Sequence, residues 1–501
     1  MRRLIAGILA LLMMAGYAMA DAPQAPDYVL EGYDGDSTGV TWETNLFFTR
    51  MQERTGISFQ FSQARNETEW KERKTAILEG KNLPDVLFKA DLTPAETRKM
   101  YEGGVIIDLK PYLEENAPDL WALLQEHPDW LEAITLPDGA IAALPAFNNM
   151  QNNDAMWINT RWLERMGLDT PATAEELTEV LRAFKTKDPN GNRSADEVPL
   201  TFIGMWELRF LGHAFGIIDN DYYVSVKDGK VVSSLTTEEN RAFLSWLHQL
   251  WDEDLLDHNG FTTTDSLRQI TDENKTIPYG MMMNATPLNV VPSSALDQFR
   301  LLLPLEYEGK QVYRDLAGSV IRGTFAITSA CKDPAELVRW VNFLYTEEGA
   351  RLAQYGEEGT EYSFTENGTW EWNEDLSTIA QITLPSNTIS FGLPAPGIAA
   401  EEFQKKYVED TTRETVEQMA ELKKYSVLPY PYVYLSDEDA AAIAALQADI
   451  MGYAEEAMAC FVTGDLELND ENWNTFCETV RAKGLEDEIS IWQKYVSNGA
   501  D

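Results

Sequence analysis

The chain has 501 residues, 44% of them hydrophobic, and carries a formal charge of −42 because 82 acidic residues outnumber 40 basic ones. So negative a chain repels nucleic acid and anionic lipid, which excludes nucleic-acid binding as its function and suits a secreted, highly soluble protein. The charge also weighs against a polyanionic ligand, although a local basic cluster in a cleft would override it.

The first 20 residues have the three-part pattern of a cleavable secretory signal. Arg2 and Arg3 precede an apolar run from Leu4 to Met14, and small residues lead to Ala20. This run is shorter than the about 20 apolar residues that a membrane span needs. We therefore expect residues 1–20 to be removed on export, and the remainder is too long for a single core.

Strands and helices alternate in the pattern that follows. Strands are predicted at 28–30, 57–61 and 83–88, and helices at 41–54 and 67–78, the second helix ending at Gly80. This alternation implies a parallel sheet, in which ligands bind beyond the carboxyl ends of the strands. The loops at 33–39 and 89–92 are therefore candidate binding loops.

A similar alternation begins again near residue 150. Helices are predicted at 174–185 and 238–251 and a strand at 279–284, and a second α/β lobe is the simplest account of this pattern. Further along the chain, a strand is predicted at 325–328, a helix at 333–345 and a mostly helical tail from residue 438.

Several short motifs follow one another in order along the chain. They are Thr55-Gly-Ile, Gly80-Lys-Asn-Leu-Pro-Asp-Val, Ala143-Leu-Pro-Ala, Met156-Trp-Ile-Asn, Trp162-Leu-Glu-Arg-Met-Gly-Leu, Pro171-Ala-Thr, Ala326-Ile-Thr, Cys331-Lys-Asp-Pro-Ala-Glu, Thr346-Glu-Glu-Gly, Tyr355-Gly-Glu-Glu-Gly and Phe461-Val-Thr-Gly. Each is weak alone, but together they are specific. From about residue 28 onward the chain resembles the family 1 extracellular solute-binding proteins of ABC importers, especially the branch with the alginate-binding proteins and LipO-type lipoproteins.

The resemblance implies a periplasmic-binding-protein-like α/β fold, with two lobes, a hinge and a ligand cleft between the lobes that closes by hinge motion. By similarity, the N-terminal lobe comprises 28–147 and 316–365, the C-terminal lobe 150–305 and 397–501, and the crossing segments 145–149, 305–316 and 365–397. We expect a monomer that binds an oligosaccharide and passes it to the permease subunits of an ABC transporter. A peptide-binding importer component and a secreted glycan-binding adhesin or sensor are the alternatives.

The cysteines separate this chain from the lipoproteins of the family. A lipoprotein needs a cysteine at the cleavage point, whereas the first cysteine here is Cys331. We therefore expect a protein free in the periplasm or outside the cell. Cys460 and Cys477 either form a bridge in an oxidising compartment or pack as thiols, and the fold does not depend on them.

The segment from Asp188 to Glu197 is a candidate calcium loop. Oxygen-bearing residues recur at alternate positions and Gly191 permits a sharp turn, a pattern that suits a hard cation. The alginate-binding relatives have a loop of this form, and the match carries to Asp188, Asn190, Asn192, Asp196 and Glu197, with the Ser194 carbonyl available. The alternative is an Asn-Gly turn with solvated polar residues. In either case the role is structural.

Aromatic and polar side chains near the implied cleft are the candidate ligand-binding residues, because a sugar ring stacks on an aromatic face while polar groups bind its hydroxyls. The aromatic candidates are Trp157, Trp206, Trp370 and Trp372, each of which also fits a core position, whereas Trp246 and Trp251 belong to an amphipathic helix and the core. The polar candidates are Lys89, Asp91, Asn148, Asn149, Asn284 and Arg322. Arg209, Arg314 and Arg322 would together pair a carboxylate if the ligand were a uronate.

An enzymatic function has little support in the sequence. Gly35-Asp-Ser37-Thr-Gly39 matches the nucleophile-elbow pattern, but it lies in a long polar loop with two aspartates rather than in a tight turn. None of the four histidines has triad partners nearby, and metalloprotease, phosphate-loop and dinucleotide motifs are absent. A glycosidase needs two carboxylates that face one bond, but a chain with 82 acidic residues always offers such a pair, so the pair is no evidence for an enzyme. We predict a binding protein, not an enzyme.

Overall fold

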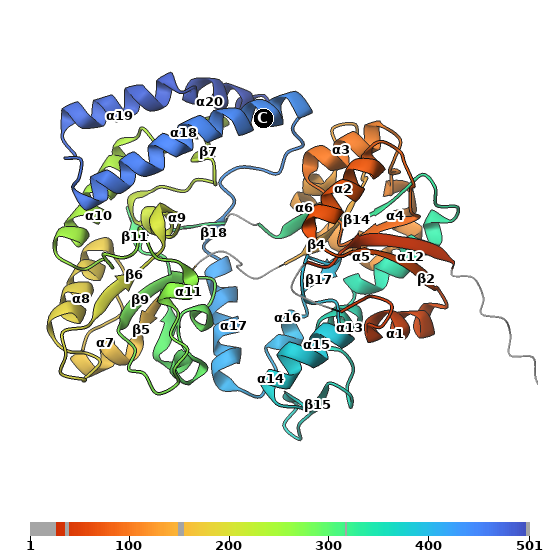
Figure 1. The fold of residues 1–501 in the computed structure, drawn as a ribbon, viewed down its shortest axis with the longest axis horizontal. Helices are drawn as coiled ribbons and strands as arrows, with labels where there is room; N and C mark the ends of the chain where they lie inside the picture. Colours follow the sequence, from red (N-terminus) through yellow and green to blue (C-terminus); the bar gives the residue numbers. More distant parts are fainter. Residues whose placement is uncertain (1–26, 36–39, 149–154, 316–317, 497–501) are drawn as a thin grey trace, which may run out of the picture.

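The computed structural model describes residues 27–35, 40–148, 155–315 and 318–496, which form two α/β lobes side by side (Figure 1). The predicted export signal and most of the Gly35–Gly39 loop lie outside the described residues. Within the described part of the chain, none of the helices is long and apolar enough to cross a membrane.

The first lobe is built on a six-stranded sheet. Its strands are, in order, β17 (Gly397–Ile398), β4 (Leu144–Phe147), β14 (Val320–Ile327), β3 (Val86–Phe88), β1 (Tyr28–Tyr33) and β2 (Phe59–Ala64). Strand β1 runs parallel to both β2 and β3, as the alternating pattern predicts, and β14 runs antiparallel to β3 and β4. Chain segments from three distant regions of the sequence therefore share one sheet.

Eight helices pack around this sheet in the described part of the first lobe. They are α1 (Leu46–Thr55), α2 (Glu67–Leu78), α3 (Pro94–Glu102), α4 (Lys110–Asn116), α5 (Pro118–Glu126), α6 (Pro128–Ile134), α12 (Pro334–Asn342) and α13 (Glu347–Tyr355). Helix α2 has the predicted bounds, but α1 begins at Leu46 rather than at residue 41. The reason is local: the Asn45 side chain accepts a hydrogen bond from the Phe47 amide at 2.9 Å and caps the helix.

The second lobe has a four-stranded sheet in the order β10 (Phe299–Leu301), β5 (Ala155–Asn159), β9 (Tyr279–Asn284) and β6 (Val198–Thr201). Its helices are α7 (Thr160–Met166), α8 (Ala174–Thr186), α9 (Gly204–Leu208), α10 (Glu238–Asp252), α11 (Asp265–Arg268), α18 (Asp437–Thr463), α19 (Asp470–Ala482) and α20 (Leu485–Gln493), with a hairpin of β7 (Val224–Lys227) and β8 (Lys230–Ser233). Trp246 of α10 is buried in the core, as predicted, and its indole nitrogen donates to the Thr178 hydroxyl at 2.9 Å. Cys460 and Cys477 are both free thiols.

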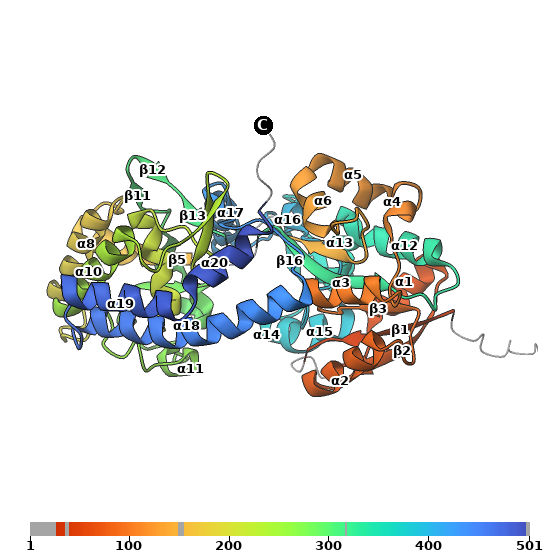
Figure 2. The same ribbon diagram turned by 90° about the horizontal axis from the view of Figure 1, so that it is seen from above.

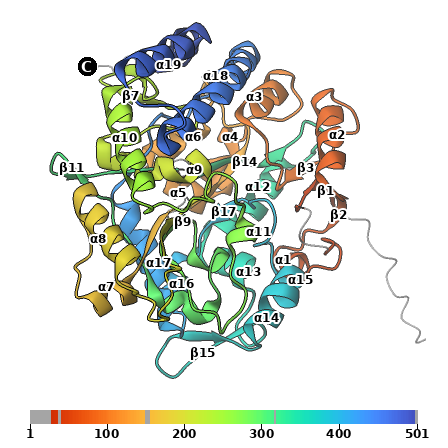
Figure 3. The same cartoon turned by 60° about the vertical axis from the view of Figure 1, so that its left-hand side comes forward.

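A smaller aromatic unit extends the first lobe at its lower end, where β15, α14, α15 and α16 lie together (Figure 3). It comprises the hairpin β15 (Tyr362–Phe364) and β16 (Trp370–Trp372), the consecutive turns α14 (Leu376–Thr378), η5 (Ile379–Thr383) and α15 (Leu384–Asn387), and α16 (Glu401–Gln404). Tyr362, Trp370, Phe403 and Tyr407 form its buried core. We call this region the aromatic unit.

The chain returns to the second lobe later than the sequence predicts. Residues 397 and 398, where the second lobe is predicted to resume, instead form β17 and pair with β4 in the first sheet. The crossing follows the aromatic unit, because α17 (Asp410–Lys423) stands between the lobes and packs on β10 of the second lobe (Figure 1). A strand of two residues is too short to leave a periodic signal in the sequence.

Two connecting segments pair with each other between the lobes. Strand β13 (Tyr313–Arg314) runs parallel to β18 (Ser426–Val427), and the chain then continues as an extended stretch to α18. In that stretch Tyr430 packs on Trp492 of the second lobe, whereas Tyr432 and Tyr434 flank the Arg322 guanidinium of the first. This stretch is therefore anchored on both lobes.

Helix α18 adds a second contact between the lobes, because its N-terminal end reaches α3 of the first lobe (Figure 2). The Lys99 ammonium and the Asp437 carboxylate lie 4.0 Å apart there, and both side chains are exposed. Exposed pairs of this kind contribute little to stability, so this ion pair adds little to the contact between the lobes.

A buried histidine links the second lobe to the connecting segment near residue 305. Nδ1 of His213 donates to the Phe210 carbonyl at 2.7 Å, and Nε2 accepts from the Leu305 amide at 2.8 Å. This bonding requires the neutral ring. Burial lowers the pKa of His213 from 6.5 to about 4, partly offset by the bond to Phe210.

We predict a pH-dependent loss of stability from His213. Because its pKa is lower in the folded state, the unfolded state binds more protons between pH 6.5 and about 4, so stability falls as pH falls through this window. Between pH 7 and 5, urea unfolding should show a loss roughly 2 kcal/mol greater in the unmodified protein than in His213→Gln. The exposed His258→Gln control should keep the full loss. An equal pH dependence in His213→Gln would contradict this role.

Candidate functional site

A cavity of about 360 Å³ opens between the two lobes, and we call it the interlobe cavity. Its walls come from both sides: Leu288, Ser293, Leu296 and Asp297 of the second lobe, Tyr355, Trp370, Trp372, Leu376, Gln404 and Tyr407 of the aromatic unit and α13, and Glu409 and Val416 next to and on α17. A ligand held here contacts both lobes at once. The volume of the interlobe cavity falls within the range of small-molecule binding sites.

Aromatic rings form the wall on the first-lobe side. Trp370 and Trp372 are two residues apart in β16, so their side chains project from the same face of the strand. Trp370 is fixed: it stacks on Phe403 with ring centroids 4.4 Å apart, and its indole nitrogen donates to the Phe403 carbonyl at 2.6 Å. Trp372 is only half-buried and stacks on Tyr355 at 5.8 Å. The arrangement offers the Trp372 and Tyr355 rings to a ligand.

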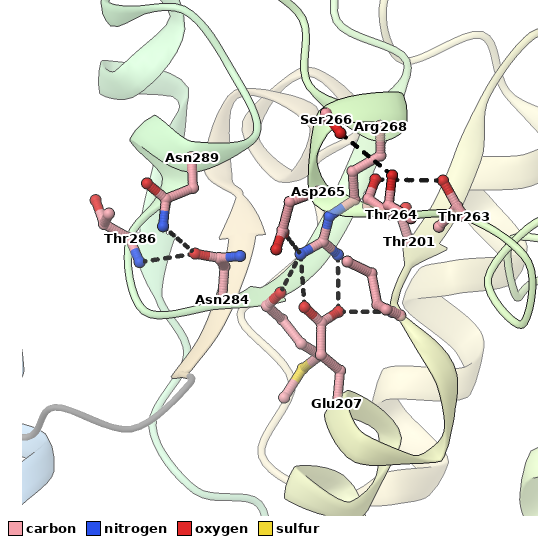
Figure 4. A network of polar contacts seen from close by, with 12 residues as sticks. Thr201, Glu207, Thr263, Thr264, Asp265, Ser266, Arg268, Asn284, Thr286 and Asn289 are labelled. Carbon is pink, nitrogen blue, oxygen red and sulfur yellow. Dashed lines mark hydrogen bonds and ion pairs between the residues drawn. The ribbon is translucent and has the colours of Figure 1, made fainter. Parts of the chain in front are cut away.

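The second-lobe wall is shaped by a short polar network at the end of β9 (Figure 4). The Asn284 side-chain oxygen accepts hydrogen bonds from the Thr286 amide at 3.3 Å and from the Asn289 side chain at 2.8 Å. These bonds hold the turn η2 (Pro287–Asn289), which presents Leu288, 47% exposed, to the interlobe cavity. Asn284 therefore shapes the wall and does not itself line the cavity.

A buried ion pair supports the same region (Figure 4). Arg268 of α11 makes two bonds to the Glu207 carboxylate of α9, at 2.7 and 2.5 Å, and both side chains are almost wholly buried. Oε2 of Glu207, the oxygen that accepts the 2.7 Å bond from Arg268, also accepts a hydrogen bond from the Ile203 amide at 2.8 Å. Bidentate geometry makes such a pair directional, so it fixes α9 and α11 relative to each other.

A second cavity, of about 500 Å³, lies beside β4 and β17 and adjoins the first; we call it the hinge cavity. Asn148 lines it, and it shares Tyr355 and Gln404 with the interlobe cavity. The Gln404 side-chain oxygen is buried and has no hydrogen-bond partner among the described residues. Leaving a buried acceptor unpaired costs about 1–3 kcal/mol, so the junction of the two cavities offers an acceptor to a bound ligand.

Some sequence-predicted residues lie at these cavities and others do not. Trp370 and Trp372 line the interlobe cavity and Asn148 the hinge cavity, whereas Asn149 lies outside the described residues. Trp157 is 1% exposed in the second core, where its indole nitrogen donates to the Asn284 carbonyl at 2.8 Å. Its buried position gives no support to a role in binding.

The other predicted residues face elsewhere. Lys89 is fully buried, and its ammonium bonds the Asp34 carboxylate and the Phe391 carbonyl. Asp91 is exposed, Trp206 is 45% exposed, and neither lines the two cavities. The Arg322 guanidinium donates to the Val433 carbonyl at 2.8 Å on the connecting stretch. For Lys89 and Arg322, these contacts indicate structural roles.

The sequence did not indicate Tyr355, Gln404, Tyr407 and Leu288 as site residues. Tyr355 begins the motif Tyr355-Gly-Glu-Glu-Gly that carries the family resemblance, and this was a usable signal. The other three reach the site only through tertiary packing between α16, η2 and α17, which leaves no local pattern.

The predicted calcium loop folds into a turn with its polar side chains facing inward. The side-chain nitrogens of Asn190 and Asn192 donate to the Asp196 carboxylate at about 3.0 Å, and the Arg193 amide donates to Asp188 at 3.2 Å. One oxygen of Glu197 is buried without a hydrogen-bond partner. Burial raises the pKa of Glu197, and the charges of Asp196 and Asp188 raise it further. In the described residues no three acidic, histidine or cysteine side chains converge as a metal site.

Two α/β lobes joined by connecting segments, with a cavity walled by both, define a two-lobed ligand-binding protein. Residues 35–351 match the family model of the bacterial extracellular solute-binding proteins, and the chain belongs to this family. The family resemblance seen in the sequence motifs is confirmed.

Similar proteins are known from several bacteria. The fructooligosaccharide ABC transporter substrate-binding protein FusA of Streptococcus pneumoniae serotype 4 is 25% identical over 97% of this chain and 95% of its own. Its complex with kestose matches with a TM-score of 0.70 at 24% identity, over 93% and 98% of the two chains. An extracellular solute-binding protein of Bifidobacterium longum subsp. infantis gives 0.78 at 21% identity, over 94% and 98%. The alginate-binding protein AlgQ2, solved without calcium ion, gives 0.65 at 19% identity, over 94% and 97%. The expected fold is confirmed.

Proposed function

We propose that the protein binds an oligosaccharide in the interlobe cavity and delivers it to the permease subunits of an ABC importer. The observation that carries the proposal is the pairing of aromatic faces at Trp372 and Tyr355 with hydrogen-bond acceptors in a cavity walled by two lobes. A sugar ring has an apolar face for stacking and hydroxyls that donate hydrogen bonds at its edge. FusA, the relative named for fructooligosaccharides, supports this assignment.

The mechanism follows from where the walls come from. A ligand that contacts Trp372 on one side and Leu288 on the other stabilises the arrangement in which these walls lie closest. Binding therefore shifts the population toward a closed form by as much as the ligand prefers it over the open form. The paired segments β13 and β18 and the stretch 428–436 are the places where the lobes rotate. The closed form is what the permease recognises.

Chemistry on the ligand is not part of this proposal. The family and the relatives described above are solute-binding proteins. Among the described residues that line the interlobe cavity, the only hydroxyl that resembles a nucleophile is Ser293, and no histidine stands beside it to activate it. Asp297 is paired with Arg161 and is not placed as a proton donor. Turnover of the sugar would contradict this view.

We also propose that the loop from Asp188 to Glu197 binds a structural calcium ion, which requires its acidic side chains to draw closer together than they lie among the described residues. Three carboxylates, those of Asp188, Asp196 and Glu197, repel one another there, and the buried unpartnered Glu197 oxygen needs a cation or a proton. Oxygen ligands of this kind are those that calcium prefers. The residues that would hold the ion are Asp188, Asn190, Asn192, Asp196 and Glu197, with the Ser194 carbonyl. A calcium ion supplies charge neutralisation there. A further FusA structure is of an EF-hand mutant in complex with fructo-nystose.

Removal of calcium should therefore destabilise the protein. Because an ion that binds only the folded state raises stability in proportion to the logarithm of its concentration, Tm should rise with added calcium and fall after chelation. Calorimetric melting of Glu197→Gln should show little of this shift, while Glu179→Gln, an exposed change on α8, should keep it. A Tm that changes neither with added calcium nor with chelator would exclude the proposed calcium site.

The aromatic wall can be tested directly. Trp372→Ala removes the half-buried ring at the cavity without breaking the Trp370–Phe403 stack, so we expect saccharide affinity to fall about tenfold or more. Trp121→Ala changes a half-buried tryptophan of α5 that lines neither cavity, and it should bind normally. Isothermal titration calorimetry measures both. Unchanged affinity in Trp372→Ala would place the binding site elsewhere.

A further inference from the structure

We propose that the interlobe cavity selects uncharged saccharides and rejects uronates, with Asp297 and Glu409 as the residues that set this specificity. The inference rests on the proposed function and names the substrate class. It matters because AlgQ2, with the same fold, is an alginate-binding protein, whereas FusA is named for fructooligosaccharides.

The cavity lining includes hydrogen-bond acceptors as well as the hydroxyls of Ser293, Tyr355 and Tyr407, which can also donate. Asp297 presents a carboxylate from the turn η3 (Ser293–Gln298) and Glu409 presents one from the start of α17, and the unpartnered Gln404 side-chain oxygen lies at the junction with the hinge cavity. None of the described residues that line the interlobe cavity is lysine, arginine or histidine. Such a wall matches a ligand that donates hydroxyl hydrogens and carries no negative charge of its own.

The local charge is also acidic around the aromatic wall. Burial raises the pKa of Tyr407, which lines the cavity, and the charges of Glu409 and Glu371 raise it further. A ligand carboxylate placed among these groups meets the same repulsion that disfavours the tyrosinate. Asp297 and Glu409 are both exposed at the cavity, so this repulsion weakens as salt is added.

Two cations near the cavity have partners among the described residues. Arg161 forms an ion pair with Asp297, and an Arg413 nitrogen donates to the Tyr407 carbonyl at 2.9 Å. These contacts reduce the negative electrostatic potential at the cavity, so a neutral ligand can bind next to two carboxylates. They do not place a guanidinium among the residues that line the cavity.

The three arginines that the sequence suggested for a uronate are not gathered at the cavity. Arg209 and Arg314, both buried, converge on the Asp219 carboxylate at 3.3 and 3.1 Å inside the second lobe. Arg322 belongs to β14 and lies between Tyr432 and Tyr434. The bidentate guanidinium contact that recognises a carboxylate is therefore absent from the described lining.

The test compares uncharged saccharides with a uronate and with the same uronate after its carboxylates are neutralised by methyl esterification. Calorimetric titrations at low and at physiological ionic strength compare kestose, maltotriose, trigalacturonate and fully methyl-esterified trigalacturonate, with a basic tripeptide as a further probe. We expect at least one uncharged saccharide to bind and trigalacturonate to bind at least about 100-fold more weakly. Because salt screens repulsion between charges, the weak binding of trigalacturonate should strengthen as ionic strength rises.

A charge-matched pair of variants locates the specificity. Asp297→Asn with Glu409→Gln should strengthen trigalacturonate binding at least tenfold and remove its salt dependence. Asp272→Asn with Glu366→Gln changes the net charge equally at exposed positions outside both cavities. This control variant should neither strengthen trigalacturonate binding nor remove its salt dependence. This contrast separates a local effect from that of the overall charge of −42.

The outcomes are distinguishable. Trigalacturonate binding as tightly as any uncharged saccharide, or the control variant relieving its exclusion as much as the cavity variant, would overturn the charge selection and leave the proposed oligosaccharide function standing. Binding of the basic tripeptide with no binding of any saccharide would overturn both, since the acidic, aromatic cavity would then serve a cation.

Discussion

The stacking of Trp370 on Phe403 is the contact on which the binding site depends. The two rings lie almost parallel, with centroids 4.4 Å apart, and an indole-to-carbonyl hydrogen bond fixes their orientation. Such a pair contributes about 0.5–1.5 kcal/mol beyond the area it buries. Its larger effect is geometric. With Trp370 fixed, Trp372, two residues along the same strand, stacks on Tyr355 of the first lobe and lines the interlobe cavity.

The connections between the lobes set the second constraint. The chain assembles the first sheet from segments as distant as β1 and β17, and β13 pairs with β18 between the lobes. Tyr430 on one side and Tyr432 with Tyr434 on the other anchor the stretch that follows. Rigid lobes with short, defined connections favour rotation as whole bodies over local unfolding.

The sequence predicted the local structure well and the site only in part. Helix α2 and the parallel strands β1 to β3 follow from strict alternation of strand and helix patterns, and the order of short motifs indicated the family. Lys89 lies at the carboxyl end of a strand, as the rule for ligand loops requires, but Asp34 lies at the end of the neighbouring strand and neutralises it. Trp157 and Trp372 look alike in sequence, and only tertiary packing places one in the core and the other at the cavity. Strand β17 has only two residues, too few for a periodic sequence pattern to predict it.

The central claim is that a saccharide draws the two lobes together around the interlobe cavity. Small-angle X-ray scattering of the full-length mature protein, with and without a saturating saccharide that calorimetry shows to bind, tests this claim most directly. We predict a smaller radius of gyration in the saturated protein, and no change when a sugar that does not bind is added. A saccharide that binds one-to-one and stays intact, with a radius of gyration equal to that of the free protein, would contradict it.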